Sequence, residues 1–267
     1  HFPEAKRFFE KEKAILKTLA PLVLDGELVI LKTEWSSDFS ALQKRRKLRS
    51  VENIEKESLM HPAVFVAFDL LVWKGKKMAF EPFIKRKELL KSIFAKNHWP
   101  LKPDPRSSFF IQFLPFFEDF SSLWEKINSY GGEGIVAKHK KSLWLEGKRT
   151  SQWLKYKNWR YVQCIVTGYE KENGFFRAGV MDKTDIVPVG SFKHGMPDKE
   201  RKALLAVIQS NKAKEDEHVI NVKPAICVEL KCIGLYENSL REPYFSRFLF
   251  SRLPEACTMD KLKLALM

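Results

Sequence analysis

Residues 63–73, AVFVAFDLLVW, constrain the fold more than any other segment. They form the longest apolar run of the chain, and Asp69 is the one charged side chain in it. A membrane-spanning helix needs about 20 apolar residues, so this run is too short to cross a bilayer. Its branched and aromatic side chains favour a strand, and a strand that is apolar on both faces is typical of the centre of a sheet. We therefore predict a buried central strand over residues 64–73 and no membrane partner.

The rest of the first 159 residues predicts helices and strands in mixed order. Asp38 is a suitable N-cap for a short helix that runs into a basic segment. Apolar side chains near helical spacing indicate further helices at residues 3–19, 81–96 and 117–128. Strand-like patterns occupy residues 22–31, 109–113, 134–139 and 153–157. The helix at 81–96 is expected to bury Phe83, Ile84, Leu89, Leu90, Ile93 and Phe94. This part of the chain is therefore expected to be α+β.

The pattern changes after Trp159, where short strand-like segments with Gly-rich connections follow one another. The expected strands lie at residues 162–169, 175–181, 185–191 and 225–235, and a helix is expected at 198–210. About five strands with one inserted helix are typical of the OB-fold, a small β-barrel. We therefore expect two domains, an α+β domain at residues 1–159 and an OB-fold domain at 160–267.

The net charge of +14 is concentrated in the first domain. Residues 1–159 hold 30 Lys and Arg against 19 Asp and Glu, a net +11, whereas residues 160–267 hold 17 against 14, a net +3. An excess of this size favours a polyanionic partner, most often nucleic acid. A charge that only improves solubility is the alternative, and clustering at residues 44–49 and 138–149 argues against it.

The cysteines indicate a reducing compartment. Cys164, Cys227, Cys232 and Cys257 form no Cys-x-x-Cys pair, so they predict neither a zinc site nor a disulfide framework. We expect reduced thiols in a cytoplasmic, nucleoid-associated bacterial protein that acts as a monomer. The histidines also lack ligand spacing, so any metal should be a hard ion such as Mg²⁺ held by oxygen atoms.

Lys155 and Lys157 stand two residues apart in the strand-like segment 153–157. Alternate residues of a strand share a face, so both ammonium groups are expected to point into one space, with Leu154 and Tyr156 on the other side. Like charges held together repel unless an anion lies between them. A solvated strand edge with protective lysines is the alternative reading.

Four segments carry a family resemblance when they are taken together: LDGEL at 24–28, FVAFDLL at 65–71, EGIVAK at 133–138 and WLKYK at 153–157. Their order and spacing resemble the nucleotidyltransferase motifs of ATP-dependent DNA ligases, nearest to the ligase module of bacterial end-joining ligases. VELK at 228–231 and LREPYFSR at 240–247 resemble the final motif of the family, at the end of its OB domain. The resemblance covers nearly the whole chain. It implies a nucleotidyltransferase (adenylation) domain that lacks its N-terminal part and is followed by an OB-fold.

The resemblance also implies roles for residues of the first three segments. Phe68 matches the aromatic ring that stacks on adenine, although it would otherwise pass for a core residue. Glu27 matches the acid near the ribose and the metal, although Asp-Gly beside it also reads as a hairpin turn. Glu133 matches an acid that holds the divalent ion, and an acid without a function would be costly in an apolar strand. ATP with Mg²⁺ or Mn²⁺ is the implied nucleotide and metal.

The basic residues match groups that bind phosphate. Lys155 and Lys157 correspond to the pair on the α-phosphate, where they would stabilise the transition state and the departing pyrophosphate. Arg149 corresponds to a nucleotide or DNA contact. Arg241 and Arg247 match the motif that closes over the β- and γ-phosphates; without the resemblance they would be taken for surface residues.

The sequence departs from the family pattern at its start. The family attacks ATP with a lysine of a Lys-x-Asp-Gly motif, and the chain has none, because Val23 stands two residues before Asp25. The arginine motif that follows the nucleophile is missing as well. We expect a truncated N-terminus; a natural loss of the nucleophile is the alternative.

The expected function is ATP-dependent sealing of nicked or broken double-stranded DNA in break repair, with a Ku-like end-binding protein as a further partner. One alternative is an RNA ligase or an mRNA capping guanylyltransferase of the same superfamily. The other is a non-catalytic OB-fold module that binds nucleic acid. Residues 44–49 are candidates for phosphodiester contacts, which carry affinity without sequence specificity.

Overall fold

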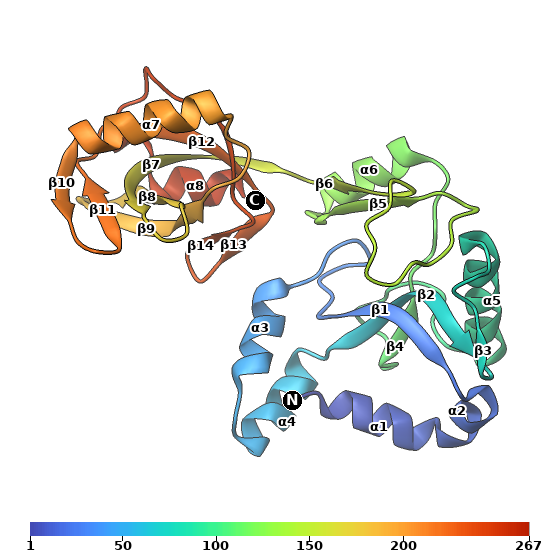
Figure 1. Cartoon of the computed structure of the whole chain (residues 1–267). Coiled ribbons are helices and arrows are strands. Elements are labelled where there is room, and N and C mark those ends of the chain that lie inside the picture. The colour runs from blue at the N-terminus through green and yellow to red at the C-terminus, as the bar shows by residue number, and fades with distance from the viewer. Residues whose placement is uncertain (267) are drawn as a thin grey trace. The chain divides into compact units, whose positions relative to one another are not determined.

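The computed structural model describes residues 1–266, and the chain divides into two compact units, His1–Asn158 (unit 1) and Trp159–Met267 (unit 2). Figure 1 shows the course of the chain through both units. The helices of unit 1 are α1 (Pro3–Lys11), α2 (Lys13–Leu19), α3 (Phe39–Lys47), α4 (Val51–Met60), α5 (Phe83–Lys96) and α6 (Phe120–Ser129). Its strands are β1 (Val23–Val29), β2 (Val64–Trp73), β3 (Lys76–Lys77), β4 (Ile111–Phe113), β5 (Gly134–Lys138) and β6 (Trp153–Lys157).

Strand β2 is the centre of unit 1, as the apolar run predicts. It pairs antiparallel with β1 and β3 and parallel with β4. Ala67 and Leu70 of β2 are completely buried against side chains of α1, α2 and α5. The cluster around them consists of Phe8, Leu19, Met78, Leu90, Ile93, Phe94, Trp99, Ile111 and Phe113. The aromatic and branched residues of β2 thus build the core that fixes this strand in place.

The helices of unit 1 match the predictions in part. The Asp38 side chain caps α3 by accepting a hydrogen bond from the Ala41 N–H, 2.9 Å away. The single helix expected at residues 3–19 is wrong: it breaks at Glu12, whose buried carboxylate accepts a hydrogen bond from the Trp99 indole. Helix α4 was not expected from the sequence.

Helix α5 buries two cations that the apolar pattern did not indicate. Arg86 and Lys87 are buried beside Phe83, Leu90, Ile93 and Phe94, whereas Ile84 and Leu89 are half-buried. Positions 83, 86, 87, 90 and 94 lie on one face of a helix with 3.6 residues per turn. Because this face of α5 is buried, the charges of Arg86 and Lys87 each need a partner inside unit 1.

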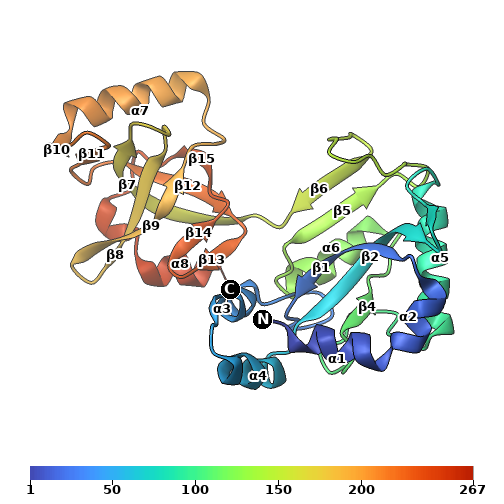
Figure 2. The same ribbon diagram turned by 60° about the horizontal axis from the view of Figure 1, so that its bottom comes forward.

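Strands β5 and β6 form an antiparallel hairpin that is separate from the four-stranded sheet. Figure 2 shows this hairpin and helix α6 as a layer of their own beside β1 and β2. The loop that leaves β5 also supports α5, because the carbonyl groups of Ser142 and Lys140 accept hydrogen bonds from the N–H groups of Phe83 and Ile84. These bonds satisfy donors at the start of the helix that have no partner within it.

Unit 2 contains a seven-stranded antiparallel sheet, a separate two-stranded sheet, and helices that pack against the larger sheet. Its strands are β7 (Arg160–Glu170), β8 (Phe176–Asp182), β9 (Asp185–Phe192), β10 (Lys212–Glu215), β11 (Val219–Val222), β12 (Cys227–Cys232), β13 (Gly234–Tyr236), β14 (Ser239–Arg241) and β15 (Tyr244–Phe248). Its helices are α7 (Asp198–Ser210), η1 (Pro254–Ala256) and α8 (Met259–Ala265). Helix α7 has the predicted bounds, and Leu204 and Ile208 anchor it on the sheet.

The topology of unit 2 does not show the closed barrel that the sequence predicts. The strands follow the path β10-β11-β7-β12-β15, and β8 and β9 branch from β7. Among the described residues, one isolated bridge from His194 to Tyr244 links the end of β9 to β15. More strands are present than the five expected, because β10 and β11 form before residue 225 and the segment after residue 225 forms several short strands instead of one.

Across residues 1–266, no helix has both the length and the apolar character needed to pass through a bilayer.

Candidate functional site

The β5–β6 hairpin presents the two lysines on one face. In its register Gly134 pairs with Lys157, Val136 with Lys155 and Lys138 with Trp153. Directly opposed residues of an antiparallel pair project to the same side. Lys155, Lys157, Lys138 and Trp153 therefore share a face, which confirms the predicted parity of the lysine pair.

The other face of the hairpin packs on helix α6. The rings of Tyr156 and Phe120 meet edge to face, with centroids 5.3 Å apart. Phe120 in turn stacks on Trp124, one turn further along the helix. This packing occupies the Tyr156 face and leaves Lys155 exposed and Lys157 half-buried on the opposite one.

Lys138 joins this face of the hairpin to β2 and α5. Its ammonium group lies 3.9 Å from the centroid of the Trp153 ring, 4.8 Å from that of Phe68 and 5.0 Å from that of Phe83. A cation at such distances is attracted to the faces of aromatic rings. The side chain is 10% exposed, and its nitrogen has no hydrogen-bond partner among the described residues. Lys138 therefore places Phe68 on the same side of unit 1 as the lysine pair.

Behind Phe68 lies a buried ion pair. The Arg86 guanidinium donates from Nε to Oδ1 and from Nη2 to Oδ2 of Asp69, both at 2.8 Å. Both side chains are 0% exposed, and Arg86 also donates to the carbonyl groups of Glu81 and Ser142. A two-pronged arrangement in which all three guanidinium nitrogens donate is the geometry in which a buried pair compensates best for lost hydration.

Lys87, the next residue of α5, holds the strand at its neighbouring position. Its ammonium donates to the carbonyl of Phe68, 2.9 Å away, and to the carbonyl of Leu114. It also lies 4.3 Å from the centroid of the Phe113 ring. Two adjacent residues of α5 thus fix two adjacent residues of β2, Phe68 and Asp69.

Burial, together with the neighbouring charges, shifts the pKa of both lysines in this cluster. Burial, followed by repulsion from Lys138, lowers the pKa of Lys87 to about 7, against an opposing attraction from Asp69. Burial also lowers the pKa of Lys138, which Asp69 and then Asp25 counteract. Helical spacing could have identified Arg86 and Lys87 from the sequence, whereas their partners come from a distant strand and were not visible there.

The predicted acids are both exposed. Glu27 lies on β1 opposite Val66, and Glu133 immediately precedes β5. The expectation that Glu133 sits inside an apolar strand is wrong, since its side chain is at the surface and carries no burial cost. The Glu133 carbonyl accepts a hydrogen bond from the Asn158 N–H, 2.9 Å away, so it lies at the same end of the hairpin as Lys157.

The remaining predicted residues lie elsewhere in the fold. Arg149 is exposed in the loop between β5 and β6. Arg241 ends β14 in unit 2, where it pairs with Gly234, and Arg247 on β15 donates to Glu229. The prediction that residues 44–49 contact DNA phosphates is wrong for Arg45. This side chain is 1% exposed and pairs with Glu4 instead of facing solvent.

The donors suit a hard metal ion that is held mainly by a nucleotide. Among the described residues, no three His, Cys, Asp or Glu side chains gather as a ready-made metal site. Mg²⁺ commonly takes only one or two carboxylates and completes its shell with phosphate oxygens and water. Exposed carboxylates such as Glu27 and Glu133 are of that type.

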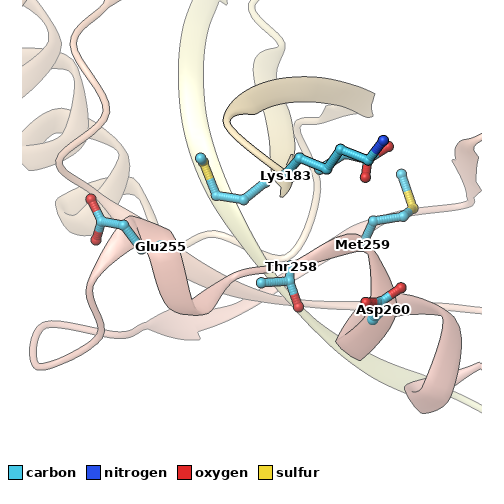
Figure 3. Close-up of a pocket in the computed structure, with 7 residues that line it drawn as sticks. Lys183, Glu255, Thr258, Met259 and Asp260 are labelled. Atoms are coloured by element: carbon cyan, nitrogen blue, oxygen red, sulfur yellow. The ribbon is translucent and has the colours of Figure 1, made fainter.

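A pocket in unit 2 holds none of the predicted site residues (Figure 3). It is lined by Met181, Asp182, Lys183, Glu255, Thr258, Met259 and Asp260. Three carboxylates against one lysine would repel a polyphosphate. The chemistry of this pocket therefore differs from that of the lysine face of unit 1.

Comparison with known proteins places these features in a family. Residues 2–157 match the family described as ATP dependent DNA ligase domain, which is more than half of the chain. The chain belongs to this ligase domain family. The matched residues contain the β5–β6 hairpin, Phe68 and the buried ion pair behind it.

Relatives of this ligase domain include proteins of end joining. The bifunctional non-homologous end joining protein LigD of Bacillus subtilis (strain 168) is 34% identical over 257 residues, 96% of the chain and 42% of that protein. The SPbeta prophage-derived DNA ligase-like protein LigB of the same strain is 29% identical over 228 residues, 84% of the chain and 74% of that protein. The chain therefore spans less than half the length of the first relative.

Solved structures agree in fold. The ligase domain superposes with a TM-score of 0.62 on the structure named Pmar-Lig_PreS3, at 21% identity, covering 90% of the chain and 54% of that structure. A structure from a study of Lig E DNA ligases gives a TM-score of 0.53 at 19% identity, covering 85% of the chain and 76% of that structure. At these identities the likeness concerns the fold alone.

Proposed function

We propose that the chain is the catalytic core of an ATP-dependent DNA ligase that seals 5′-phosphate/3′-hydroxyl breaks in double-stranded DNA. The observation that carries this proposal is the shared face of Lys155, Lys157 and Lys138, with Phe68 beside the last. Two ammonium groups and an aromatic ring suit the phosphates and the base of one nucleotide. Membership of the ATP-dependent DNA ligase domain family supports ATP as this nucleotide.

Each residue of the site has a chemical task in this proposal. Phe68 stacks on adenine, and Glu27 contacts the ribose and would be one of the carboxylates that hold the metal. Lys155 and Lys157 bind the α-phosphate and stabilise the charge that develops as pyrophosphate departs. Glu133 is the second metal carboxylate, and Arg149 contacts the nucleotide or DNA. Mg²⁺ or Mn²⁺, when bound, neutralises the phosphate oxygens.

The reaction requires a lysine nucleophile that is not among these residues, since the 267 residues contain no Lys-x-Asp-Gly segment. In the proposed scheme this lysine takes AMP from ATP. AMP then passes to the 5′-phosphate of the break, and the 3′-hydroxyl displaces it as the strands are joined. Lys155 and Lys157 stay on the same phosphorus-bound oxygens through each transfer.

Unit 2 is proposed to be an OB-fold, and its Arg241 is proposed to contact the β- and γ-phosphates of the nucleotide. Support comes from the long strand β7, which pairs with β8, β11 and β12, and from the His194–Tyr244 bridge between strand ends. One bent strand shared by several partners is expected where a small sheet curls towards a barrel.

A role in double-strand-break repair, with a Ku-like end-binding partner, is the most specific part of the proposal. It is supported by the end-joining relative that matches 96% of the chain. The basic surface of unit 1 suits the phosphate backbone of DNA.

Labelling and sealing assays on the full-length protein test the proposal. With α-labelled ATP and Mg²⁺ we expect covalent labelling and sealing of a nicked duplex. Glu133→Ala and Lys155→Ala should each abolish labelling while the far-UV spectrum stays unchanged, and Lys140→Ala, an exposed lysine that pairs with Glu118, should not. Labelling from GTP alone would indicate a capping enzyme. Absence of both labelling and sealing would indicate a binding module.

A further inference from the structure

The backbone of Phe68 lies at one of the two irregularities in the pairing of β2 with β1. In the pairing of β1 with β2, Asp25 pairs with Asp69 and Gly26 with Ala67, so the register passes over Phe68. On the other side, the parallel ladder with β4 ends where Ala67 pairs with Phe113 and accepts a hydrogen bond from the Leu114 N–H. Phe68 therefore lies in a β-bulge on one side and just beyond the last pair on the other. A bulge aims its side chain by local backbone geometry.

Lys87 lies beside Phe68, where the pairing of β2 with β1 is interrupted and its pairing with β4 ends. Its ammonium bridges the carbonyl of Phe68 in β2 and the carbonyl of Leu114 directly after β4. The residue is 2% exposed, so water cannot readily replace it. Without Lys87, the partly buried carbonyl groups of Phe68 and Leu114 would lose the donor that they share, and the bridge between the two strand ends would be lost.

The neighbouring Arg86–Asp69 ion pair does not hold the Phe68 carbonyl. Arg86 holds the side chain of Asp69, and that side chain also accepts from the Leu70 N–H. These contacts fix the strand on the C-terminal side of the bulge. The Phe68 carbonyl itself is held by Lys87.

We propose that Lys87 is a positioning residue for the nucleotide base: by holding the Phe68 bulge from behind, it sets the angle at which the Phe68 ring meets adenine. The inference rests on the proposed nucleotide site. Lys87 touches neither phosphate nor base in this proposal, so its influence is confined to the part of the binding energy that comes from stacking.

The distinction between base and phosphate supplies the test. Binding is measured on the full-length protein without divalent cation, so that no AMP transfer occurs. One probe is 2-aminopurine riboside triphosphate, an isomer of ATP whose fluorescence falls when its base stacks. The other is inorganic tripolyphosphate, which can use the lysine face but has no base.

Lys87→Met keeps the length of the side chain and removes its donors. We expect weaker binding of the 2-aminopurine nucleotide by about tenfold, with most of the quenching lost, as when a base loses its stacking partner. Tripolyphosphate binding should be unchanged. Lys87→Gln keeps two N–H donors on a shorter neutral side chain and should restore part of the quenching. Lys91→Met, at an exposed position one turn along α5, is the matched control and should behave like the wild type.

Two results would overturn the inference while leaving the proposed function intact. One is full quenching in Lys87→Met. The other is an equal loss of tripolyphosphate and nucleotide binding, which would assign Lys87 to the stability of unit 1 as a whole. A wild-type protein that binds neither probe would instead overturn the proposed function, and the inference with it.

Discussion

A single helical turn of α5 concentrates the unusual electrostatics of unit 1. Arg86, Lys87 and Lys138 surround one fully buried anion, Asp69. The Asp69–Arg86 pair is well compensated, and removing one partner of such a pair typically costs about 3–5 kcal/mol. Burial is the main cause of the lowered pKa of Lys87 and of Lys138, and repulsion from the neighbouring cation adds to it in each case.

The lowered pKa of Lys87 predicts a pH dependence of stability. The folded protein releases this proton near pH 7, whereas the unfolded chain keeps it until about pH 10.5. Between these values the unfolded state binds more protons, so the free energy of unfolding should rise with pH, by up to about 1.4 kcal/mol per pH unit. The gain should be absent in Lys87→Met.

Urea denaturation of both proteins at pH 7, 8 and 9, with the thiols kept reduced, measures this difference. Tryptophan fluorescence reports chiefly on unit 1, because Trp159 is the one tryptophan in unit 2. A difference between wild type and Lys87→Met that stays constant across this range would contradict the assigned titration.

At the scale of elements, the β5–β6 hairpin depends on one glycine. Gly134 pairs with Lys157 and has a φ of +145°, and a Cβ atom there would lie 2.1 Å from the Tyr156 carbonyl oxygen and 2.9 Å from the Lys157 Cα. Gly134→Ala should therefore force the strands apart beside Lys157. We expect a loss of about 3 kcal/mol in the free energy of unfolding and little or no ATP labelling.

Gly131→Ala is the matched control. Gly131 also has a positive φ, +66°, but a Cβ atom there meets nothing within 4 Å. Its loss should stay near the 1 kcal/mol roughly expected for a left-handed alanine, with labelling retained. Equal losses of stability in the two variants would show that the positive φ, and not the close approach of Gly134 to β6, makes glycine necessary in the hairpin.

The elements also show how far the sequence could predict the structure. Strand β2, the hairpin strands and the parity of Lys155 and Lys157 follow from local patterns alone. The bulge at Phe68 does not, because it arises from the pairing of β2 with two other strands. The burial of Lys87 does not either: helical spacing places Lys87 on the buried face of α5, but only the folded sheet supplies the carbonyl groups that accept its hydrogen bonds. The sequence could therefore predict which residues belong to the site, whereas their geometry depends on tertiary contacts.

At the scale of the whole molecule, the uneven charge predicts where DNA contacts concentrate. Unit 1 contains most of the +14 net charge, and helix α3 presents Lys44, Arg46 and Lys47 to solvent while Arg45 is buried. The buried Arg45 anchors α3 by donating to the carbonyl groups of His1 and His61. The exposed cations beside it are thus held on a fixed helix.

Lys44→Ala combined with Lys47→Ala should weaken binding of nicked duplex DNA by the full-length protein. Each lysine that contacts a phosphate contributes about 0.9 to the slope of log affinity against log salt concentration, so the slope should fall by up to about 1.8. The matched control is Lys199→Ala combined with Lys202→Ala, which removes the same charge at the same spacing from exposed positions of α7. Fluorescence anisotropy from 50 to 200 mM salt measures both slopes. If the two double variants lower the slope equally, net charge alone attracts the DNA; a larger effect at α3 assigns this helix to the DNA-binding face of unit 1.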